Sequence, residues 1–478
     1  MKAIKYIIIC FCALTLATSC DDFLNITPDG QVKRDPQLSY PEGIEDALYG
    51  AYSQLRSTSL YGQELHFSTL ELLANNLWCK DNDAVDAMCS FNYTDTRVQD
   101  IFEAVWTLMY NNISNVNSIL DAPLVKNAKE DEYPYNIYKG EALALRAFMH
   151  FDLVRLFAEQ ITQNPDAAGI PYQKEFSLNT PAFESLQKNY ENILNDLLTA
   201  EKMLANEGEY ADASNFMKDR QIHLNLYAVK ALLARVYFTM GNNTEALKYA
   251  KDVIDNSGRT LTAKTKVVGD LAGVLSPTEA LWGVYYAGFY TQVHAKLHLT
   301  TSFYSYDLRD GFVELYDKNL VGQDYRSIAN FTYVEYGQNE QKARLIKLTD
   351  SYELNNNASS RPSEYILGIN MIRLPEMYYI ASEILLESDY DLALYYFDEV
   401  IKNRGLEPFA NRATNNTLTQ EILNEERLKE YIGEGQTFFN MKRQHLPIVS
   451  YDGKTTHQPS KEMYVVPVPN IEYENRYE

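Results

Sequence analysis

The sequence is short of positive charge and of long apolar runs, and both shortages exclude functions. Its 43 lysines and arginines face 65 aspartates and glutamates, which gives a formal net charge of −22. A chain this acidic repels phosphate backbones, so we exclude nucleic acid as a partner. An anionic lipid surface repels it as well, so contact with a membrane requires a tether. No stretch approaches the roughly 18 consecutive apolar residues of a transmembrane helix.

Cysteine is also scarce, and three of the five cysteines lie within the first 20 residues. Lys2 and Lys5 precede an apolar stretch at 6–16, and small residues then lead to Cys20. A basic start, an apolar core and a small-residue cleavage site predict a secretory signal peptide. A cysteine just after the cleavage site predicts a lipoprotein signal peptide over residues 1–19, with lipid on Cys20. The alternative is an ordinary cleaved signal that happens to precede a cysteine.

The predicted lipid decides where the protein works. Acyl chains contribute roughly 0.8 kcal/mol for each buried CH₂, and stable anchoring takes more than one chain. A bacterial lipoprotein cysteine carries more than one. Asp21 and Asp22 follow Cys20 directly, and acidic residues there are common in outer-membrane lipoproteins displayed at the cell surface. We therefore expect residues 20–478 to form a body that is lipid-anchored to the outer membrane and exposed at the cell surface.

Two cysteines remain in the body, Cys79 and Cys89. They lie in an oxidising compartment if the signal functions, and a disulfide that closes this short loop is then plausible. Two buried free thiols are the alternative, and the sequence leaves both open.

The sequence also lacks a recognisable catalytic or metal-binding motif. It has no G-x-S-x-G and no Walker-type loop. His294 and His298 are four residues apart, but "HAKLH" lacks the glutamate of the metalloprotease helix. "DNDAVD" at 81–86 has calcium-like alternation without the following glycine and glutamate, so we interpret it as a solvated loop. We expect a protein that is not an enzyme and has no cofactor or metal.

Helical periodicity runs through most of the chain. Apolar residues recur three and four positions apart over 138–159 and 190–204, which predicts two amphipathic helices. Two later segments share small and apolar residues at offsets of twelve and nineteen. They are Ala234, Ala246 and Val253 in the first, and Ala381, Ala393 and Val400 in the second. Such spacing is typical of tetratricopeptide-type helical hairpins, expected near 138–255 and 371–445. Because the copies are not adjacent in sequence, we expect scattered hairpins that share one core, without a continuous solenoid.

Two stretches have a different texture, 60–100 and 257–370. Short aromatic-rich runs there are broken by Gly, Asn and Ser. This predicts a loop-rich subdomain with a few short strands, within a mostly α protein. Loops of such length inside a compact protein tend to be functional, so we expect the ligand side there.

Six segments in order resemble the SusD/RagB family of outer-membrane nutrient-binding lipoproteins. They are "CDDFLNITPDGQV", "GEALALRAFMHFDLVRLFAE", "AVKALLARVYFTMGNNTEALKYAKDVI", "MIRLPEMYYIASEILL", "LNEERLKEYIGEGQTFFNMKRQ" and "MYVVPVPNIEYENRY". The fifth is similar to the pattern E-R-x-x-E-x-x-x-E-G-x-x-x-x-D-x-x-R and departs from it at Asn440, where aspartate is usual. The resemblance runs from Cys20 to Glu478 and implies a SusD-like fold.

The resemblance also implies a role. Family members lie on the cell surface as a lid over a SusC-like TonB-dependent barrel, capture a glycan and deliver it for import, without hydrolysing it. Some capture peptides instead. A RagB-like member that captures peptide or protein, and a surface scaffold with no small ligand, therefore stay open as alternatives. The few tryptophans, three in all, keep the peptide reading open, because glycan platforms often use Trp.

In the family, ligand is held by aromatic platforms and polar side chains on variable loops, so two sets of residues become candidates. The first is Trp78 with Asn75, Asn76, Asp81 and Asp83 beside it; the alternative for Trp78 is a ring that caps the core. The second is the aromatic set Tyr286, Phe289, Tyr290, Tyr304 and Tyr306. We interpret Trp106 and Trp282 as core. We place the motif residues Arg146, Arg155, Arg427 and Glu434 in helices, where ion pairs lock hairpins together.

Overall fold

A computed structural model of the protein describes most of the chain in atomic detail. It describes residues 34–266, 275–297, 305–316, 322–336, 340–349, 352, 358–362, 365–414, 417–474 and 476. The predicted signal peptide at 1–19 and the predicted lipid site Cys20 lie outside these residues. Among the residues within them, no helix is both long and apolar enough to cross a membrane.

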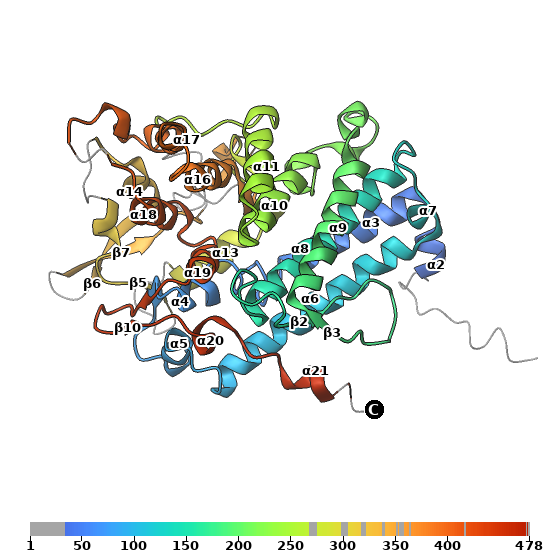
Figure 1. Ribbon diagram of the computed structural model, residues 1–478, viewed down its shortest axis with the longest axis horizontal. Coiled ribbons are helices and arrows are strands. Elements are labelled where there is room, and N and C mark those ends of the chain that lie inside the picture. The colour runs from blue at the N-terminus through green and yellow to red at the C-terminus, as the bar shows by residue number, and fades with distance from the viewer. Residues whose placement is uncertain are drawn as a thin grey trace, which may run out of the picture.

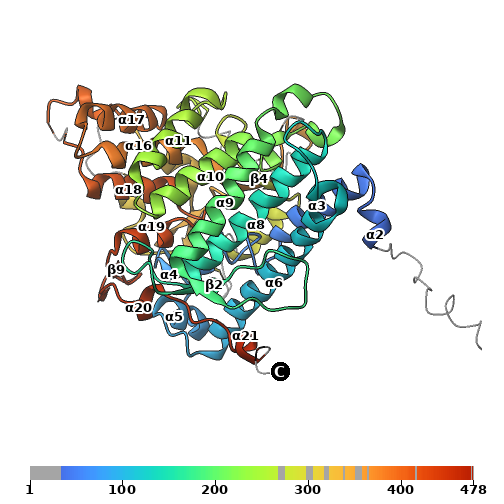
Figure 2. The same cartoon turned by 45° about the vertical axis from the view of Figure 1, so that its right-hand side comes forward.

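Eight long helices form a continuous array (Figures 1 and 2). In order they are α3 (Pro41–Leu55), α6 (Thr96–Asp121), α8 (Tyr135–Phe157), α9 (Leu186–Leu204), α10 (Leu226–Thr239), α11 (Asn243–Asn256), α16 (Leu374–Leu385) and α17 (Tyr390–Asn403). Each packs against the next. The expectation of hairpins without a continuous solenoid is therefore wrong. Helices α11 and α16 pack directly although more than a hundred residues separate them, because the intervening chain loops out of the array.

Small residues let neighbouring helices of the array approach closely. Ala234 of α10 and Ala246 of α11 are fully buried, and so are Ala381 of α16 and Ala393 of α17. The two hairpins also contact each other at small residues, since Ile254 of α11 packs on the cluster around Ala381 and Ala393. The spacing of these residues thus predicted the hairpins correctly.

Local signals in the sequence set the helix ends. Asn225 begins α10 by accepting hydrogen bonds from the backbone N–H groups of Tyr227 and Ala228 at 3.0 Å. Asn242 caps α11 in the same way, and Asp389 caps α17. These side chains satisfy N–H groups that the first turn of a helix leaves without partners. Gly241 makes the turn between α10 and α11 with a φ of 72°, a conformation that costs glycine little.

Shorter elements follow. Within the described residues, the other α-helices are α2 (Arg34–Gln37), α4 (Thr69–Leu73), α5 (Asp83–Cys89), α7 (Pro123–Lys126), α13 (Phe289–Leu297), α14 (Tyr325–Asn330), α18 (Gln420–Tyr431), α19 (Thr437–Gln444), α20 (Lys461–Tyr464) and α21 (Asn470–Glu474). The strands pair two by two, all antiparallel. They are β1 (Leu77–Trp78) with β5 (Asp307–Leu308), β2 (Ala168–Pro171) with β3 (Phe183–Ser185), β4 (Ala280–Tyr285) with β8 (Gly368–Arg373), β6 (Phe331–Tyr336) with β7 (Glu340–Leu345), and β9 (Ile448–Val449) with β10 (Thr456–His457). This confirms a mostly α protein with a few short strands.

A buried ion network joins the strand-bearing region to the array. Its members are the cations Arg326, Lys347, Arg373, Arg404 and Lys429, and the carboxylates Glu279, Asp324, Glu426, Glu430 and Glu434. All ten are buried, and the charges balance. Glu430 of α18 contacts three of the guanidinium groups. Burial raises the pKa of Glu430, but Arg404 and Arg373 outweigh it and hold that pKa well below its usual range.

Candidate ligand-binding surface

Trp78 is a fixed, half-buried ring at the edge of β1. Its strand pairs with β5, so that Trp78 lies opposite Asp307. The indole Nε1 donates a hydrogen bond to the carbonyl oxygen of Leu308 at 3.2 Å. The ring stacks on Tyr451, with centroids 4.9 Å apart and an interplanar angle of 6°. Lys342 Nζ lies 5.8 Å from the centre of the ring. Trp78 and Tyr451 together therefore form a rigid aromatic pair that is partly open to solvent.

The two asparagines before Trp78 do not belong to a ligand surface, and their prediction as ligand contacts is corrected. Asn75 and Asn76 are both fully buried. Asn75 donates to the carbonyl oxygen of Cys89 and accepts from the backbone N–H of Tyr451. Asn76 donates to Glu71 at 2.8 Å. Both amides join segments of the protein to one another and have no exposed surface that a ligand could contact.

Asp81 and Asp83 are exposed beside the start of α5. Asn82 between them caps that helix by accepting from the backbone N–H of Val85. Asp83 lies in the first helical turn, where the helix dipole favours a carboxylate. The alternating acidic residues at 81–86 thus belong to the start of helix α5.

Cys79 and Cys89 are buried thiols and do not form a disulfide with one another, which decides the alternative that the sequence left open. The Cys89 thiol donates to the carbonyl oxygen of Leu77 at 3.7 Å. Burial raises the pKa of this thiol to about 12. A thiol so strongly protonated is unreactive.

Tyr286 marks an open polar pocket. It is half-buried and lies just before α13. The pocket has a volume of about 510 Å³ and is lined mainly by hydroxyl and amide side chains. Its lining comprises Ser53, Gln54, Arg56, Ser57, Thr58, Leu60, Leu108, Asn111 and Tyr286. The guanidinium of Arg56 lies 5.8 Å from the centre of the Tyr286 ring. The pocket thus offers one aromatic face surrounded by hydrogen-bonding groups.

The other aromatic candidates are half-buried, buried or outside the described residues. Tyr290 is half-buried on α13, with its ring 5.4 Å from that of His294. Phe289 and Tyr306 are buried, which corrects their selection as ligand contacts. The Tyr306 hydroxyl lies 2.9 Å from that of Ser68. Tyr304 lies outside the described residues.

Helix α13 connects the Trp78 and Tyr286 positions. At its start, the backbone N–H of Phe289 donates to the carbonyl oxygen of Tyr286. At its end, the N–H of Tyr306 donates to the carbonyl oxygen of Lys296 at 2.7 Å, and the next residue pairs with Trp78. Nine helical residues span about 13 Å. We name the surface from Trp78 and Tyr451 to Tyr286 and its pocket the α13 surface.

Comparisons with known proteins agree with this architecture. A family model described as "Starch-binding associating with outer membrane" matches residues 22–238, and the model of the SusD family matches residues 234–478. The chain belongs to the SusD family. Two curated relatives from Formosa agariphila, SusD-like proteins P2 and P38, are 26% and 25% identical over 262 and 263 residues. These alignments cover 53% and 51% of this chain, and it spans about half the length of each relative, 47% and 48%.

Solved structures of SusD proteins show the same fold. A SusD superfamily protein from Bacteroides thetaiotaomicron has a TM-score of 0.74 at 21% identity, with 91% of this chain and 97% of that chain covered. One from Bacteroides vulgatus has a TM-score of 0.73 at 20% identity, with the same coverage. A SusD-like carbohydrate-binding protein from Bacteroides vulgatus has a TM-score of 0.70 at 18% identity and covers 91% of this chain and 96% of its own.

Two of the SusD motif residues join neighbouring helices by ion pairs, as predicted. Arg146 of α8 pairs with Asp196 of α9 at 2.7 Å, and Arg427 of α18 pairs with Glu383 of α16. Arg155 pairs with Asp152 on its own helix. Glu434 belongs to the buried ion network, but it lies in the loop after α18 and not in a helix. Trp106 and Trp282 are buried, which confirms both as core.

Sequence reasoning missed the partners that make the α13 surface of this SusD protein. Tyr451 comes from the loop between β9 and β10, and Arg56 and Asn111 come from the end of α3 and from α6. No local pattern singles out these residues. The sequence contains only an indirect indication. A large ring such as Trp78 needs neighbours that cover part of it, but the sequence does not say which residues these are.

Proposed function

We propose that this chain is a cell-surface glycan-binding lipoprotein. It is anchored in the outer membrane through lipid on Cys20, captures oligosaccharide or polysaccharide, and passes it to a SusC-like TonB-dependent transporter. Membership of the SusD family and the chemistry of the α13 surface support this proposal. The ligand is bound and leaves unchanged.

The Tyr286 pocket is the observation that carries the proposal. Sugar rings present C–H faces that pack on aromatic planes, and their hydroxyls need hydrogen-bonding partners. The pocket combines the Tyr286 ring with the exposed polar side chains of Gln54, Arg56 and Asn111. An aromatic platform with hydroxyl, amide and guanidinium groups around it suits a neutral sugar better than an apolar or strongly charged ligand.

Trp78 and Tyr451 extend this binding surface. The pair lies at the other end of α13, about 13 Å of helix away. Asp81 and Asp83 are exposed close by in sequence and supply acceptors for sugar hydroxyls. Two aromatic positions at this separation favour an extended oligosaccharide over a single sugar, because only a chain of rings contacts both.

A glycan array probed with the mature body, residues 20–478 carrying Cys20→Ser, tests the proposal. We expect binding to one class of glycan, and we expect Tyr286→Ala to weaken it roughly five- to hundredfold, since stacking on an aromatic ring contributes about 1–3 kcal/mol. Tyr395→Ala is the matched control, because Tyr395 is an exposed tyrosine on α17, 55% accessible and far along the array. Binding to peptides with none to glycans would replace the proposal by the peptide-capture alternative.

Two further experiments test location and chemistry. Cys20→Ala in the full chain should release the protein from membranes into the soluble fraction, and an antibody to the body should label intact cells expressing the wild type. Labelling only after permeabilisation contradicts surface capture. Incubating purified protein with a glycan that it binds should produce no new reducing ends. Reducing ends that disappear in a single carboxylate variant would reveal an enzyme.

A further inference from the structure

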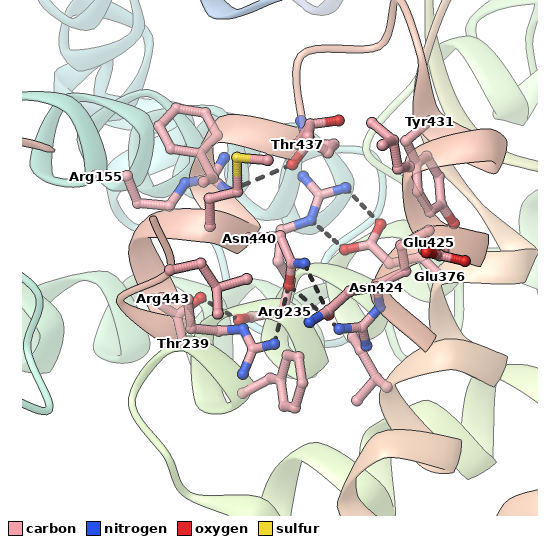
Figure 3. A pocket seen from close by; sticks show the side chains of 18 residues that line it. Arg155, Arg235, Thr239, Glu376, Asn424, Glu425, Tyr431, Thr437, Asn440 and Arg443 are labelled. Carbon is pink, nitrogen blue, oxygen red and sulfur yellow. Dashed lines mark hydrogen bonds and ion pairs between the residues drawn. The ribbon is translucent and has the colours of Figure 1, made fainter. Parts of the chain in front are cut away.

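A second pocket, with a volume of about 200 Å³, lies between α10, α16, α18 and α19. Its charged side chains pair within the protein. Both oxygens of Glu376 accept from Arg235 at 2.6 Å, and Arg427 and Arg443 both pair with Glu383. Figure 3 shows Arg235, Glu376 and Arg443 among the side chains that line this pocket. These arginines therefore leave no charge for a ligand, and the uncovered surface of the molecule lies elsewhere.

The loop between β2 and β3 carries the most exposed large apolar side chain that the structure describes. Leu178 is fully exposed, whereas the next in the described part of the chain, Tyr333, is 58% exposed. Phe176, two residues before Leu178, is 44% exposed. Single exposed apolar residues are ordinary on a protein surface, but these two share one short loop. We name residues 172–182 the β2–β3 loop.

Side chains of α6 hold the backbone of the first half of the β2–β3 loop. Asn117 Nδ2 donates to the carbonyl oxygens of Gln173 and Glu175, at 3.1 and 3.3 Å. The backbone N–H of Phe176 donates to Asp121 Oδ2 at 2.9 Å. The position of the loop is therefore set by the helix beneath it.

The tip of the β2–β3 loop is also fixed. Gln173 Nε2 donates to the carbonyl oxygens of Ser177 and Asn179, at 3.3 and 3.2 Å. The backbone N–H of Asn179 donates to Ser177 Oγ at 3.0 Å. These two residues flank Leu178. Because the backbone is held on both sides of it, the Leu178 side chain stays directed into solvent.

The β2–β3 loop lies at the end of the molecule where α3 begins. Asp121, which holds the loop, is the last residue of α6, and α7 follows at once. The carbonyl oxygen of Lys126 in α7 accepts from Lys139 near the start of α8 at 3.2 Å. The hydroxyl of Tyr138 donates to Glu45 in the first turns of α3 at 2.7 Å. Figures 1 and 2 both show α2 at this same end.

This end is the one nearest to the proposed lipid on Cys20. The residues between Cys20 and Arg34 at the start of α2 span at most about 45–50 Å, even fully extended. The α2 end of the body therefore stays within this distance of the lipid surface. Tyr40, directly before α3, is 45% exposed and adds an amphipathic ring of the kind enriched at membrane–water interfaces.

The charge of the β2–β3 loop suits a neutral lipid surface. Lys174 and Glu175 are its only charged residues, so the loop is neutral within a chain of net charge −22. An anionic surface repels the chain as a whole, whereas zwitterionic headgroups do not. Apolar groups at such a surface enter the boundary between headgroups and acyl chains, about 5–10 Å deep.

We propose that the β2–β3 loop docks on a neutral lipid surface and inserts the Leu178 side chain among the acyl chains. This inference rests on the proposed lipid anchor at Cys20, because the tether makes the contact intramolecular. A few apolar side chains do not hold a free body on a membrane. On a tethered body they set its orientation, with the α2 end at the lipid and α17, the last helix of the array, away from it.

Fluorescence quenching on vesicles tests the docking. Leu178→Cys in the lipidated mature chain is labelled with an NBD fluorophore and reconstituted in phosphatidylcholine vesicles that contain brominated acyl chains. Cys79 and Cys89 are buried, so the new thiol reacts selectively. We expect blue-shifted emission and quenching at least roughly fivefold stronger than for the same label at Tyr395→Cys, on α17. Equal quenching at the two positions overturns the proposal.

Leu178→Asp tests whether this side chain causes the docking. The label is now placed at Thr180→Cys, an exposed position of the same loop. We expect Leu178→Asp to reduce its quenching at least roughly threefold, because a carboxylate does not enter acyl chains. The fold should not suffer at a fully exposed position. Tyr395→Asp is the matched control, since it exchanges another exposed apolar residue for the same charge, and it should leave the quenching unchanged.

Flotation through a density gradient separates this inference from the proposed function. The lipidated protein should float with the vesicles, and the Cys20→Ser variant should not. Protein that floats without quenching at position 178 keeps the anchor and overturns the docking. Protein that does not float overturns both. Shielding of the label from aqueous iodide without quenching by brominated chains would assign the loop to a protein contact and overturn the lipid assignment.

Discussion

The helical array and the strand-bearing region between α11 and α16 differ in how far their packing relies on buried charge. In the array, alanines such as Ala246 and Ala393 bring helices together among apolar neighbours, and only single ion pairs such as Arg146 with Asp196 join neighbouring helices. The strand-bearing region packs on the array through Trp282 of β4, which contacts Phe148 of α8, and the buried ion network adds a second connection, in which Arg373 at the end of β8 meets Glu430 of α18. Apolar seams tolerate gradual change, but a buried ion pair fails when one partner is lost. The two regions should therefore respond differently to substitution.

The largest effect is expected at the centre of the ion network. Glu430→Gln leaves Arg373 and Arg404 with one negative charge fewer in a buried site, which costs about 3–5 kcal/mol of unfolding free energy. Urea denaturation measures the loss, and hydrogen exchange should show α14 loosening before α8 and α9. Glu191→Gln is the control, since its pair with Lys188 is exposed and screened by water and should contribute little to stability. Equal effects from the two variants would remove the distinction between the regions.

The next prediction compares a fully buried tryptophan, Trp282, with a half-buried one, Trp78. Trp282 of β4 is fully buried, so Trp282→Ala should cost about 3–5 kcal/mol. Trp78 is half-buried against Tyr451, so Trp78→Ala should lower the melting temperature less and should weaken glycan binding instead. Calorimetry gives both quantities. Unchanged glycan affinity with a clearly lowered melting temperature would make Trp78 a core residue and leave the site with Tyr286.

The next prediction concerns the contact between neighbouring helices of the array, where a larger side chain should be harmful. Ala246→Leu inserts a larger side chain where α10 and α11 meet, and we expect a loss of about 1–3 kcal/mol. Ala205→Leu, at an exposed position just after α9, should change stability by less than about 0.5 kcal/mol. Thermal unfolding followed by circular dichroism distinguishes these outcomes. A seam that accepts leucine without loss would argue against close helix approach.

The last prediction concerns pH, through Glu71 of α4. Burial raises the pKa of this carboxyl from 4.5 to about 7, although Asn76 and the backbone N–H groups of Gly435 and Gly433 lower it. Because the folded pKa lies above the unfolded one, this contribution to stability is complete below about pH 4.5 and is lost as pH rises through 7. One proton limits the slope to about 1.4 kcal/mol per pH unit.

Glu71→Gln should remove this pH dependence. The Asn76 amide can turn so that its oxygen, which has no hydrogen-bond partner in the described part of the chain, accepts from the new side chain. The variant should therefore gain stability relative to wild type between about pH 5 and 7.5, as measured by urea denaturation at each pH. A difference that does not vary with pH would show that Glu71 does not titrate in this range.

The sequence predicted the periodic parts of the fold well and the assembled surfaces poorly. Apolar spacing predicted helices at 138–159 and 190–204, close to the observed α8 and α9, because periodicity is a local property. It did not predict that α11 meets α16, since that contact depends on where the intervening chain leaves and returns. Glu434 was placed in a helix, but Gly433 and Gly435 adopt positive φ and end α18 before it.

The candidate site shows the same limit residue by residue. Asn75 and Asn76 have the composition of a sugar site, yet they are fully buried, and composition alone does not reveal burial. Tyr451 stacks on Trp78 although the two residues are far apart in the sequence, so no pattern around Trp78 predicts this contact. Tyr286 is a half-buried ring that lines a pocket, and its role in binding stays a prediction.

The pairing of β4 with β8 has a consequence for how this protein can change. These strands bring the two ends of the segment that separates α11 from α16 back to one place, next to the array. The entropy cost of closing a loop grows only with the logarithm of its length, so lengthening the chain between the strands costs little. An exchanged segment from 286 to 367 would still have to keep Arg326 and Lys347, which pair with Glu426, Glu430 and Glu434 in the buried ion network. Insertions between the two strands can therefore lengthen this segment while the helical array keeps its packing.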